Sequence, residues 1–383
     1  MTVASEISRL QTAKSSIKTS IENKGVTVPS ETKFDGYSQL IDTISSGEWA
    51  PDPTWPQNLA TWTPSGGIGF IMSNASYGKV SFIVDTASAN YTVVVNDGTS
   101  DISTTSYASG AQCDVSITAG DGTTYYAVKI TSTSNITRFR VVKTTLPATG
   151  QVVPILYWYG NLTTLTDCSR MFYPSNVTAA SAKCSLLQAS YVLSTANVTD
   201  MSYQYYYCVG LQSVTKSIDC TNLVNASYMY GICVKLKNIS TMTNPNNLVN
   251  LDNVLQNCYS LKNTPTISIS SVTTMNNYLD SAFEFYMTTL DLSSGSALTK
   301  LYINNTPGLK GLTVSSTAPW GTNTPQIDIT NCGLDRAALI ALFNSLGTVT
   351  SKTIKITGNI GVPELTATDL LIATNKGWTV TTA

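Results

Sequence analysis

The side chains that offer chemistry in this chain are carboxylates, cysteines and tyrosines, because histidine is absent. The 383 residues include 23 Asp and Glu, 8 Cys and 20 Tyr but 0 His. Without an imidazole the chain lacks Ser-His-Asp and Cys-His nucleophiles, histidine-ligated zinc and a histidine pH switch. Among the remaining side chains, we consider paired carboxylates for catalysis and the aromatic side chains for ligand binding.

Paired carboxylates are what a polysaccharide-cleaving enzyme requires. The acidic residues in the second half of the chain are Asp167, Asp200, Asp219, Asp252, Asp280, Glu284 and Asp291. Asp167 and Asp200 occupy a position that holds Asn in later repeat units, and an amide cannot act as a general acid. Asp280 and Glu284 are four residues apart, which is more typical of a solvated pair than of a catalytic dyad. Because no phosphate-loop or calcium-loop motif is present either, we expect no enzyme activity, no cofactor and no metal site.

The cysteines belong to a repeat. Five units that open on an apolar residue follow one another at steps of 25, 25, 24 and 26, beginning at Val198, Leu223, Leu248, Val272 and Leu298. Ten positions into the first three units stands a cysteine, and three positions later a leucine: Cys208, Cys233, Cys258, Leu211, Leu236 and Leu261. A period of about 20–29 residues with this phasing is typical of leucine-rich repeats, whose coils stack equivalent side chains into columns.

This repeat also predicts what its small and polar residues do. We interpret the cysteines as a reduced structural ladder of small hydrophobic side chains, not as ligands or nucleophiles, since no close Cys pair offers a metal site. Asp200, Asn225 and Asn250 stand in register two positions into their units. We expect them to bond the backbone of the adjacent coil.

Tyrosines gather in two adjacent units, at Tyr203, Tyr205, Tyr206, Tyr207, Tyr228 and Tyr230. Successive positions cannot all face one way, so one interpretation is that most of these side chains are packing residues. The other is that alternate tyrosines form an exposed strip that binds a glycan or a cell-surface protein. The candidate receptor-binding residues are Tyr203, Tyr205, Tyr228 and Tyr230. A second aromatic group, at 157–159, is another candidate for binding at the entry to the repeats, but we expect it to bury the domain junction there.

The first residues predict a self-associating helix. Ile7, Leu10, Ile17 and Ile21 follow an a/d pattern over about two heptads, and isoleucine at both seam positions favours a homotrimer. A second short amphipathic helix is expected over 34–44, before a proline-rich linker at 51–56. The alternative is that both helices pack as a hairpin against the next domain.

Short β-rich runs separated by turns follow this linker. They cover 69–72, 80–84, 91–95, 115–117, 125–130 and 139–142, and they predict a small β-sandwich. The segment from Tyr91 to Thr99, which ends in Asn-Asp-Gly-Thr, resembles the strand and turn of PKD-like sandwiches. Those domains usually carry Trp-Gly-Asp-Gly-Thr there, so the Trp and the first Gly are replaced. The resemblance implies a spacer module.

The fold class that we expect is mainly β and multidomain. Residues 1–49 form a helical oligomerisation and attachment segment, 50–147 a β-sandwich, 148–320 a leucine-rich-repeat solenoid, and 321–383 an α/β cap that closes the solenoid. Within the cap, the sequence predicts a helix over 335–346.

Composition excludes several classes of partner. Charged residues make up 12% of the chain and the net charge is -1, which excludes the basic surface that nucleic acid requires. No run of eighteen apolar residues is present, so we expect no membrane insertion. The first residues lack a basic start followed by an apolar run, so we expect synthesis in a cytoplasm.

The repeat wording gives a family resemblance. Val198-Thr199-Asp200-Met201-Ser202-Tyr203 and the run from Tyr206 to Leu211 look like the repeat of BspA-like bacterial surface proteins, V-T-N-M-S-x-M-F-x-N-C-x-x-L. The match covers roughly 160–315 and departs by having Tyr in place of Met-Phe. The segment from Ile327 to Val380 and the N-terminal helix pair resemble parts of bacteriophage tail fibres and tail-tip proteins.

Together these resemblances imply a virion structural protein. They imply a tail or baseplate-attached fibre, joined to the tail through its N-terminus, whose repeat tip adheres to a glycan or protein of the host surface. The alternatives are a bacterial surface adhesin with the same repeat and, less favoured, a polysaccharide depolymerase.

Overall fold

The computed structural model divides the chain into two compact units, Met1–Pro53 and Thr54–Ala383. It describes residues 67–74, 78–142, 152–160, 163–173, 183–184, 186, 188–191, 195–214, 217–239, 241–262, 268–282 and 289–383, and in the first unit single residues at 11, 14, 15, 17, 18 and 28. Of the predicted trimer residues, Ile17 is helical and half-buried. Ile7, Leu10, Ile21, the expected helix at 34–44 and the linker at 51–56 lie outside the described residues.

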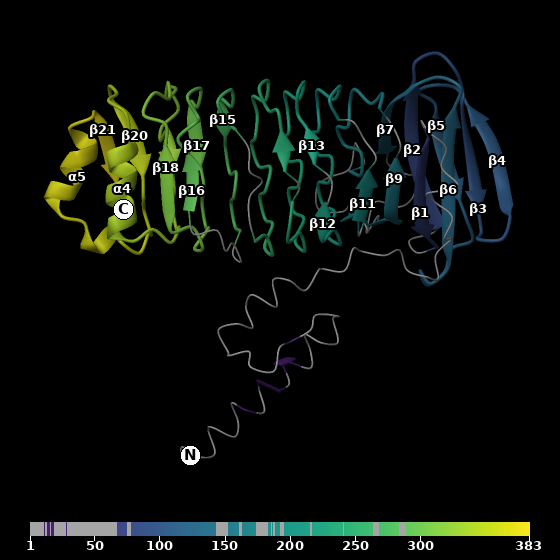
Figure 1. Cartoon of the computed structure of the whole chain (residues 1–383), viewed down its shortest axis with the longest axis horizontal. Helices are drawn as coiled ribbons and strands as arrows, with labels where there is room; N and C mark the ends of the chain where they lie inside the picture. The colour runs from purple at the N-terminus through teal and green to yellow at the C-terminus, as the bar shows by residue number, and fades with distance from the viewer. Residues whose placement is uncertain are drawn as a thin grey trace. The chain divides into compact units, whose positions relative to one another are not determined.

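The second unit is mainly β, which confirms the coarse prediction (Figure 1). Its first strands are β1 (Ile68–Ser73), β2 (Lys79–Thr86), β3 (Tyr91–Asn96), β4 (Asp101–Tyr107), β5 (Gln112–Ser116), β6 (Tyr125–Ser132) and β7 (Ile136–Val142). The sequence predicts six of these but not β4. That strand is exposed from Asp101 to Ser106, so it carries no alternation of apolar and polar residues.

These strands form two antiparallel layers. One is the three-stranded sheet β5-β2-β7, and the other is the β1-β6-β3-β4 part of a seven-stranded sheet. The rings of Phe70, Phe82 and Phe139 meet between the layers with centroids 5.4 to 6.2 Å apart. At the β3–β4 turn the Asp97 carboxylate accepts from the backbone N–H groups of Thr99 and Ser100.

Both layers continue into the stacked coils that follow. In one layer β1 pairs with β9 (Ile155–Gly160), which then pairs in parallel with β11 (Gln188–Tyr191) and through it with β12 (Ser213–Val214). In the other, Arg138 of β7 bridges to Asp167 of the first coil. The expected spacer is therefore corrected: its sheets are hydrogen-bonded into the coils along both layers.

The coils stack through single-residue parallel bridges that repeat every coil. The bridges run in order through Arg138, Asp167, Asp200, Asn225, Asn250 and Thr274. Short strands outside these bridges and outside the C-terminal sheet are β8 (Val152–Val153), β10 (Lys183–Cys184), β13 (Ile218–Asp219), β14 (Met242–Thr243), β16 (Thr289–Leu292) and β18 (Gly311–Val314). The apolar residues that open the five units are 0% exposed, and so are the six Cys and Leu residues of the predicted ladder. The stacked coils therefore bury these apolar, Cys and Leu positions in each of the repeat units that carry them.

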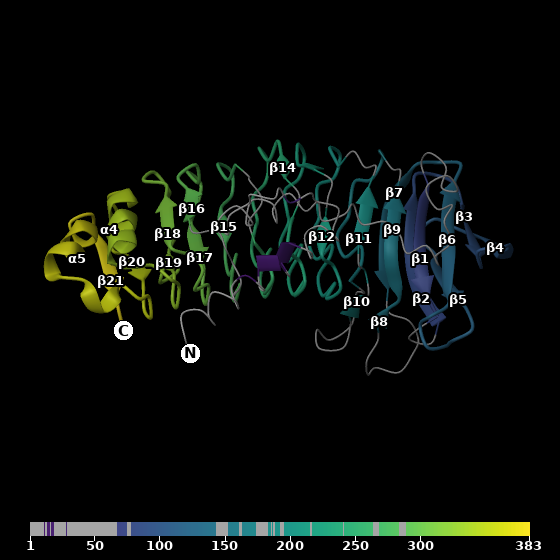
Figure 2. The same ribbon diagram turned by 60° about the horizontal axis from the view of Figure 1, so that its bottom comes forward.

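The C-terminal end combines parallel strands with two helices (Figure 2). A five-stranded parallel sheet runs through β15 (Thr274–Met275), β17 (Lys300–Tyr302), β19 (Ile327–Asp328), β20 (Lys352–Lys355) and β21 (Trp378–Thr381). The helices are α4 (Arg336–Ser345), where the sequence predicts one, and α5 (Ala367–Thr374), with a short 3-10 turn η2 (Val362–Glu364) before α5. The Lys376 Nζ donates to the carbonyls of Phe343, Asn344 and Leu346 and so closes the C-terminus of α4. Across the described part of the chain, no helix is long and apolar enough to cross a bilayer.

Candidate functional site

Each coil turns at residues that adopt the left-handed backbone conformation. One column of such residues, with φ between 50° and 57°, contains Arg170, Tyr203, Tyr228, Asn253 and Asn277. A second column, four residues further along each coil, has φ between 53° and 63° and contains Tyr207, Ile232, Asn257, Ser281, Asn305 and Asn331. Asn is the residue that tolerates this conformation best after Gly, whereas Tyr and Ile rarely adopt it. The early coils therefore hold aromatic residues against the local backbone preference.

The first column is a stack of planar groups. The Arg170 guanidinium carbon lies 4.5 Å from the ring centroid of Tyr203. The rings of Tyr203 and Tyr228 are 4.7 Å apart and nearly parallel, at 9°. Backbone N–H groups of Arg170 and Tyr203 each donate to the following coil, at the carbonyls of Ser202 and Ser227. The coil ladder therefore fixes the spacing of this stack.

Further tyrosines surround the stack, and we call the group the tyrosine cluster. Its members are Tyr173, Tyr203, Tyr206, Tyr207 and Tyr228, with Arg170 at its edge. The Tyr206 ring meets the rings of Tyr173, Tyr203 and Tyr228 nearly edge-on, at 4.9, 5.3 and 5.6 Å. A Cβ at Gly231 would lie 2.9 Å from the Tyr206 ring, so glycine is needed there for this packing. Tyr203, Tyr207 and Tyr228 are half-buried and present part of their surface to solvent.

Two of the four predicted binding residues lie elsewhere. Tyr205 and Tyr230 are 1% exposed, and their rings stack 5.3 Å apart inside the coils, continuing from Phe172 at 5.5 Å. The prediction that Tyr205 and Tyr230 bind a receptor is therefore wrong. Each lies two residues after a left-handed residue, Tyr203 or Tyr228, at which the coil turns a corner, and its side chain points into the core. Tyr203 and Tyr228 keep a solvent-facing position. Trp158, predicted to bury the entry to the repeats, is 0% exposed and packs between Phe139 and Phe172.

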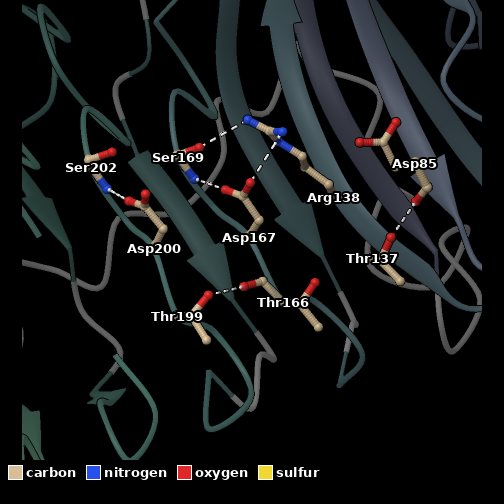
Figure 3. A network of polar contacts seen from close by, with 9 residues as sticks. All are labelled: Asp85, Thr137, Arg138, Thr166, Asp167, Ser169, Thr199, Asp200 and Ser202. Atoms are coloured by element: carbon tan, nitrogen blue, oxygen red, sulfur yellow. Dashed lines mark hydrogen bonds and ion pairs between the residues drawn. The ribbon is translucent and has the colours of Figure 1, made fainter. Parts of the chain in front are cut away.

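A polar network fixes the backbone that leads into the first two corners (Figure 3). The Asp167 carboxylate accepts from the Ser169 N–H at 2.7 Å and pairs with Arg138 at 3.2 Å, while Arg138 also donates to the Ser169 hydroxyl. The Asp200 carboxylate accepts from the Ser202 N–H at 2.7 Å. These bonds close turns directly before Arg170 and Tyr203.

This network corrects one prediction. The column of Asp and Asn residues was expected to bond the backbone of the adjacent coil. Each side chain instead accepts from the N–H two residues further along its own coil, as Asn225 does from Ser227 and Asn250 from Asp252. The reason is the local turn geometry that Asx side chains favour.

Burial favours the neutral phenol at three members of the tyrosine cluster, Tyr173, Tyr206 and Tyr228. Burial raises the pKa of Tyr206 to about 12, and it also raises the pKa values of Tyr173 and Tyr228. Arg170 is thus the cation of the cluster. It forms no ion pair with any residue that the structure describes; the pairs found there join Arg138 to Asp167 and Arg336 to Asp369.

The cysteines are buried inside the fold, and the thiols of several donate hydrogen bonds to backbone carbonyls. All eight are free and buried. The thiols of Cys233 and Cys258 donate to the carbonyls of Tyr205 and Tyr230 in the preceding coil, both at 3.1 Å. Burial raises the pKa of Cys258 to about 12, which disfavours a nucleophilic thiolate. Among the residues with assigned positions, no group of three or more His, Cys, Asp or Glu is arranged to hold a metal ion.

The carboxylates that were candidates for catalysis accept hydrogen bonds from neighbouring residues of the coils. Asp219 accepts from Thr221, and Asp291 from the backbone of Ser293. Asp252 accepts two bonds from Asn276, and Asp280 accepts from Asn305 in the next coil. Glu284 lies outside the described residues. These contacts give the carboxylates a structural role in the turns and between coils.

No family model, curated protein or solved structure matches this chain.

Proposed function

We propose that this protein is a structural protein of a bacterial virus tail, a fibre that binds the host cell surface through its tyrosine cluster. In this proposal the coils form a solenoid of the leucine-rich-repeat type, and the first two β-layers are a PKD-like sandwich that closes one end of it. The N-terminal helix would assemble the homotrimer and attach it to a tail or baseplate protein.

The observation that carries the binding role is the identity of the corner residues. Tyr203 and Tyr228 hold a left-handed φ that Asn253 and Asn277 hold in the next coils of the same column. A left-handed non-Asn residue costs about 1 kcal/mol or more of backbone strain. Strained residues with partly exposed aromatic rings are typical of binding surfaces, because tyrosine combines apolar area with a polar tip.

The test replaces both tyrosines by the residue that the following coils use. The variant Tyr203→Asn/Tyr228→Asn is expected to melt no lower than about 2 °C below the parent chain, since relief of strain offsets the lost ring contact. Labelled full-length protein should bind bacterial cells from a Gram-positive and Gram-negative panel, and the variant should lose that binding.

Tyr259→Asn is the matched control, because Tyr259 is 40% exposed and lies outside the tyrosine cluster. It should bind cells like the parent. If the double variant binds normally, the cluster is not the receptor site. If it loses binding and folding together, the tyrosines are packing residues and the binding role falls.

A further inference from the structure

We propose that Arg170 makes the tyrosine cluster selective for an anionic polysaccharide, one that carries carboxylate or phosphate groups along its chain. This inference rests on the proposed function, because the same cluster is the surface that meets the cell. It adds the chemical class of the ligand and the residue that selects it.

The first argument is the orientation of Arg170. Its guanidinium lies over the Tyr203 ring at 4.5 Å and near the Tyr173 ring at 5.8 Å. Stacking holds the planar group in place and leaves its N–H donors at the edge, where they match the two oxygens of a carboxylate or a phosphate. A guanidinium held in this way is preorganised for an oxyanion.

The second argument is that the neighbouring acids are already engaged. Asp167 is paired with Arg138 and accepts from Ser169, and Asp200 accepts from Ser202. Arg170 has no ion-pair partner within the described ranges. Its charge also acts on the cluster, where it partly opposes the effect of burial that raises the pKa of Tyr173. Arg170 is therefore a positive charge that no carboxylate among the described residues pairs with, while the negative charge of Asp252 acts on Tyr228 at the other end of the stack.

The third argument concerns what the tyrosines offer. The ring faces of Tyr203 are covered by Arg170 on one side and by Tyr228, 4.7 Å away, on the other. A sugar ring cannot stack on a face that is already covered, so recognition of a neutral sugar by stacking on Tyr203 is disfavoured. What remains are ring edges, polar groups and the cation, a combination that recognises charge and hydrogen-bonding groups.

The arrangement also suits a linear polymer. Arg170, Tyr203 and Tyr228 follow one another on successive coils at 4.5 and 4.7 Å. An extended chain lying along this column would meet the cation and then ring edges at a regular spacing. Charge-assisted hydrogen bonds at the cation would supply selectivity.

The experiment measures binding of the full chain to three polymers by biolayer interferometry at 50 and 500 mM salt. The probes are polygalacturonate for carboxylate, poly(glycerol phosphate) for phosphate, and dextran as the neutral polymer. Arg170→Asn introduces the residue found at Asn253 in the same column, so the left-handed backbone is kept. Arg170→Lys keeps the charge without the planar donors. Lys235→Gln, at an exposed site outside the cluster, is the control for net charge.

The parent chain is expected to bind at least one anionic polymer and not dextran, more weakly at high salt. Arg170→Asn should weaken binding about tenfold or more, Arg170→Lys by less, and Lys235→Gln should match the parent. If only polygalacturonate binds, the site recognises carboxylates. If only poly(glycerol phosphate) binds, the site recognises phosphates. If both bind, the site accepts either group.

Equal binding of dextran, or normal binding by Arg170→Asn, would overturn the inference. So would cell binding that depends on Tyr203 and Tyr228 without binding of any of the anionic polymers, and in that case the proposed function survives. If instead the polymers bind through Arg170 but no cell in the panel is bound, the inference stands and the host-adhesion proposal fails.

Discussion

Two tyrosines of this chain that are only two residues apart lie in different environments, one facing solvent and one in the core. Tyr203 turns a corner and meets solvent, whereas Tyr205 fills the core. A sequence motif of consecutive tyrosines cannot show which is which, because the left-handed corner that sets the phase is adopted by residues that rarely take it. The residue at this position accordingly changes along the column, from Tyr203 and Tyr228 to Asn253 and Asn277.

The inner tyrosines make a prediction about hydroxyl groups. The buried Tyr230 hydroxyl has no hydrogen-bond partner among the residues that the structure describes, so Tyr230→Phe is expected to leave stability unchanged or to raise it by about 1 kcal/mol. Tyr91 is equally buried, but its hydroxyl donates to the Ala111 carbonyl at 2.6 Å, so Tyr91→Phe should lower stability by about 1 kcal/mol. Urea unfolding of both variants checks the contrast, and a loss at position 230 as large as at 91 would contradict it.

The cysteines give a second prediction at this scale. All eight are buried, and burial raises the pKa of Cys332 as well as that of Cys258 to about 12. We expect no thiol to react with a disulfide reagent at pH 8 in the folded chain, and all eight to react after unfolding in urea. Rapid labelling of the folded chain would show that the coils open far more readily than their hydrogen bonding implies.

At the scale of the elements, helices α4 and α5 are joined by an ion pair between Arg336 of α4 and Asp369 of α5. The bidentate bond from Arg336 and the Thr366 groups hold the pKa of Asp369 at about 2, below its ordinary 3.8. Because the folded-state pKa is lowered, this carboxylate stabilises the fold above about pH 4 and loses that effect as the pH falls towards 2.

Asp369→Asn therefore should be less stable than the parent at pH 7, with a difference that narrows steadily as the pH falls from about 4 towards 2. Thermal unfolding at pH 7, 4, 3 and 2 measures this convergence. Asp101→Asn, in the exposed strand β4, controls for the loss of one negative charge. A difference that stays constant across the series would assign the effect to lost helix capping alone.

An element could be predicted from the sequence only where burial of its side chains makes apolar residues recur at a regular spacing. The repeat of Cys208, Cys233 and Cys258 fixed the stacked columns, since every coil buries the same positions. Strand β4 left no such trace because its side chains are exposed. The positions of Tyr203 and Tyr205 depended on a corner conformation that only the three-dimensional stack imposes.

At the scale of the whole second unit, β-region and coils are one hydrogen-bonded structure. Strand β7 begins one ladder and β9 continues the other, so a force or a displacement applied at the coils is transmitted through backbone bonds rather than through a linker. The tyrosine cluster sits on the coils nearest this junction, where Trp158 packs between Phe139 and Phe172.

The one-bridge-per-coil ladder also sets how such a protein can change length. Adding or removing a whole unit of 25 residues, such as that between Asn225 and Asn250, leaves the bridges at both joins intact. Each such change moves everything beyond it by about 4.8 Å, the spacing of neighbouring strands. The length of the stack therefore changes only in steps of one coil. The distance from the tyrosine cluster to the C-terminal helices can change in this way without any alteration of the cluster or of the helices.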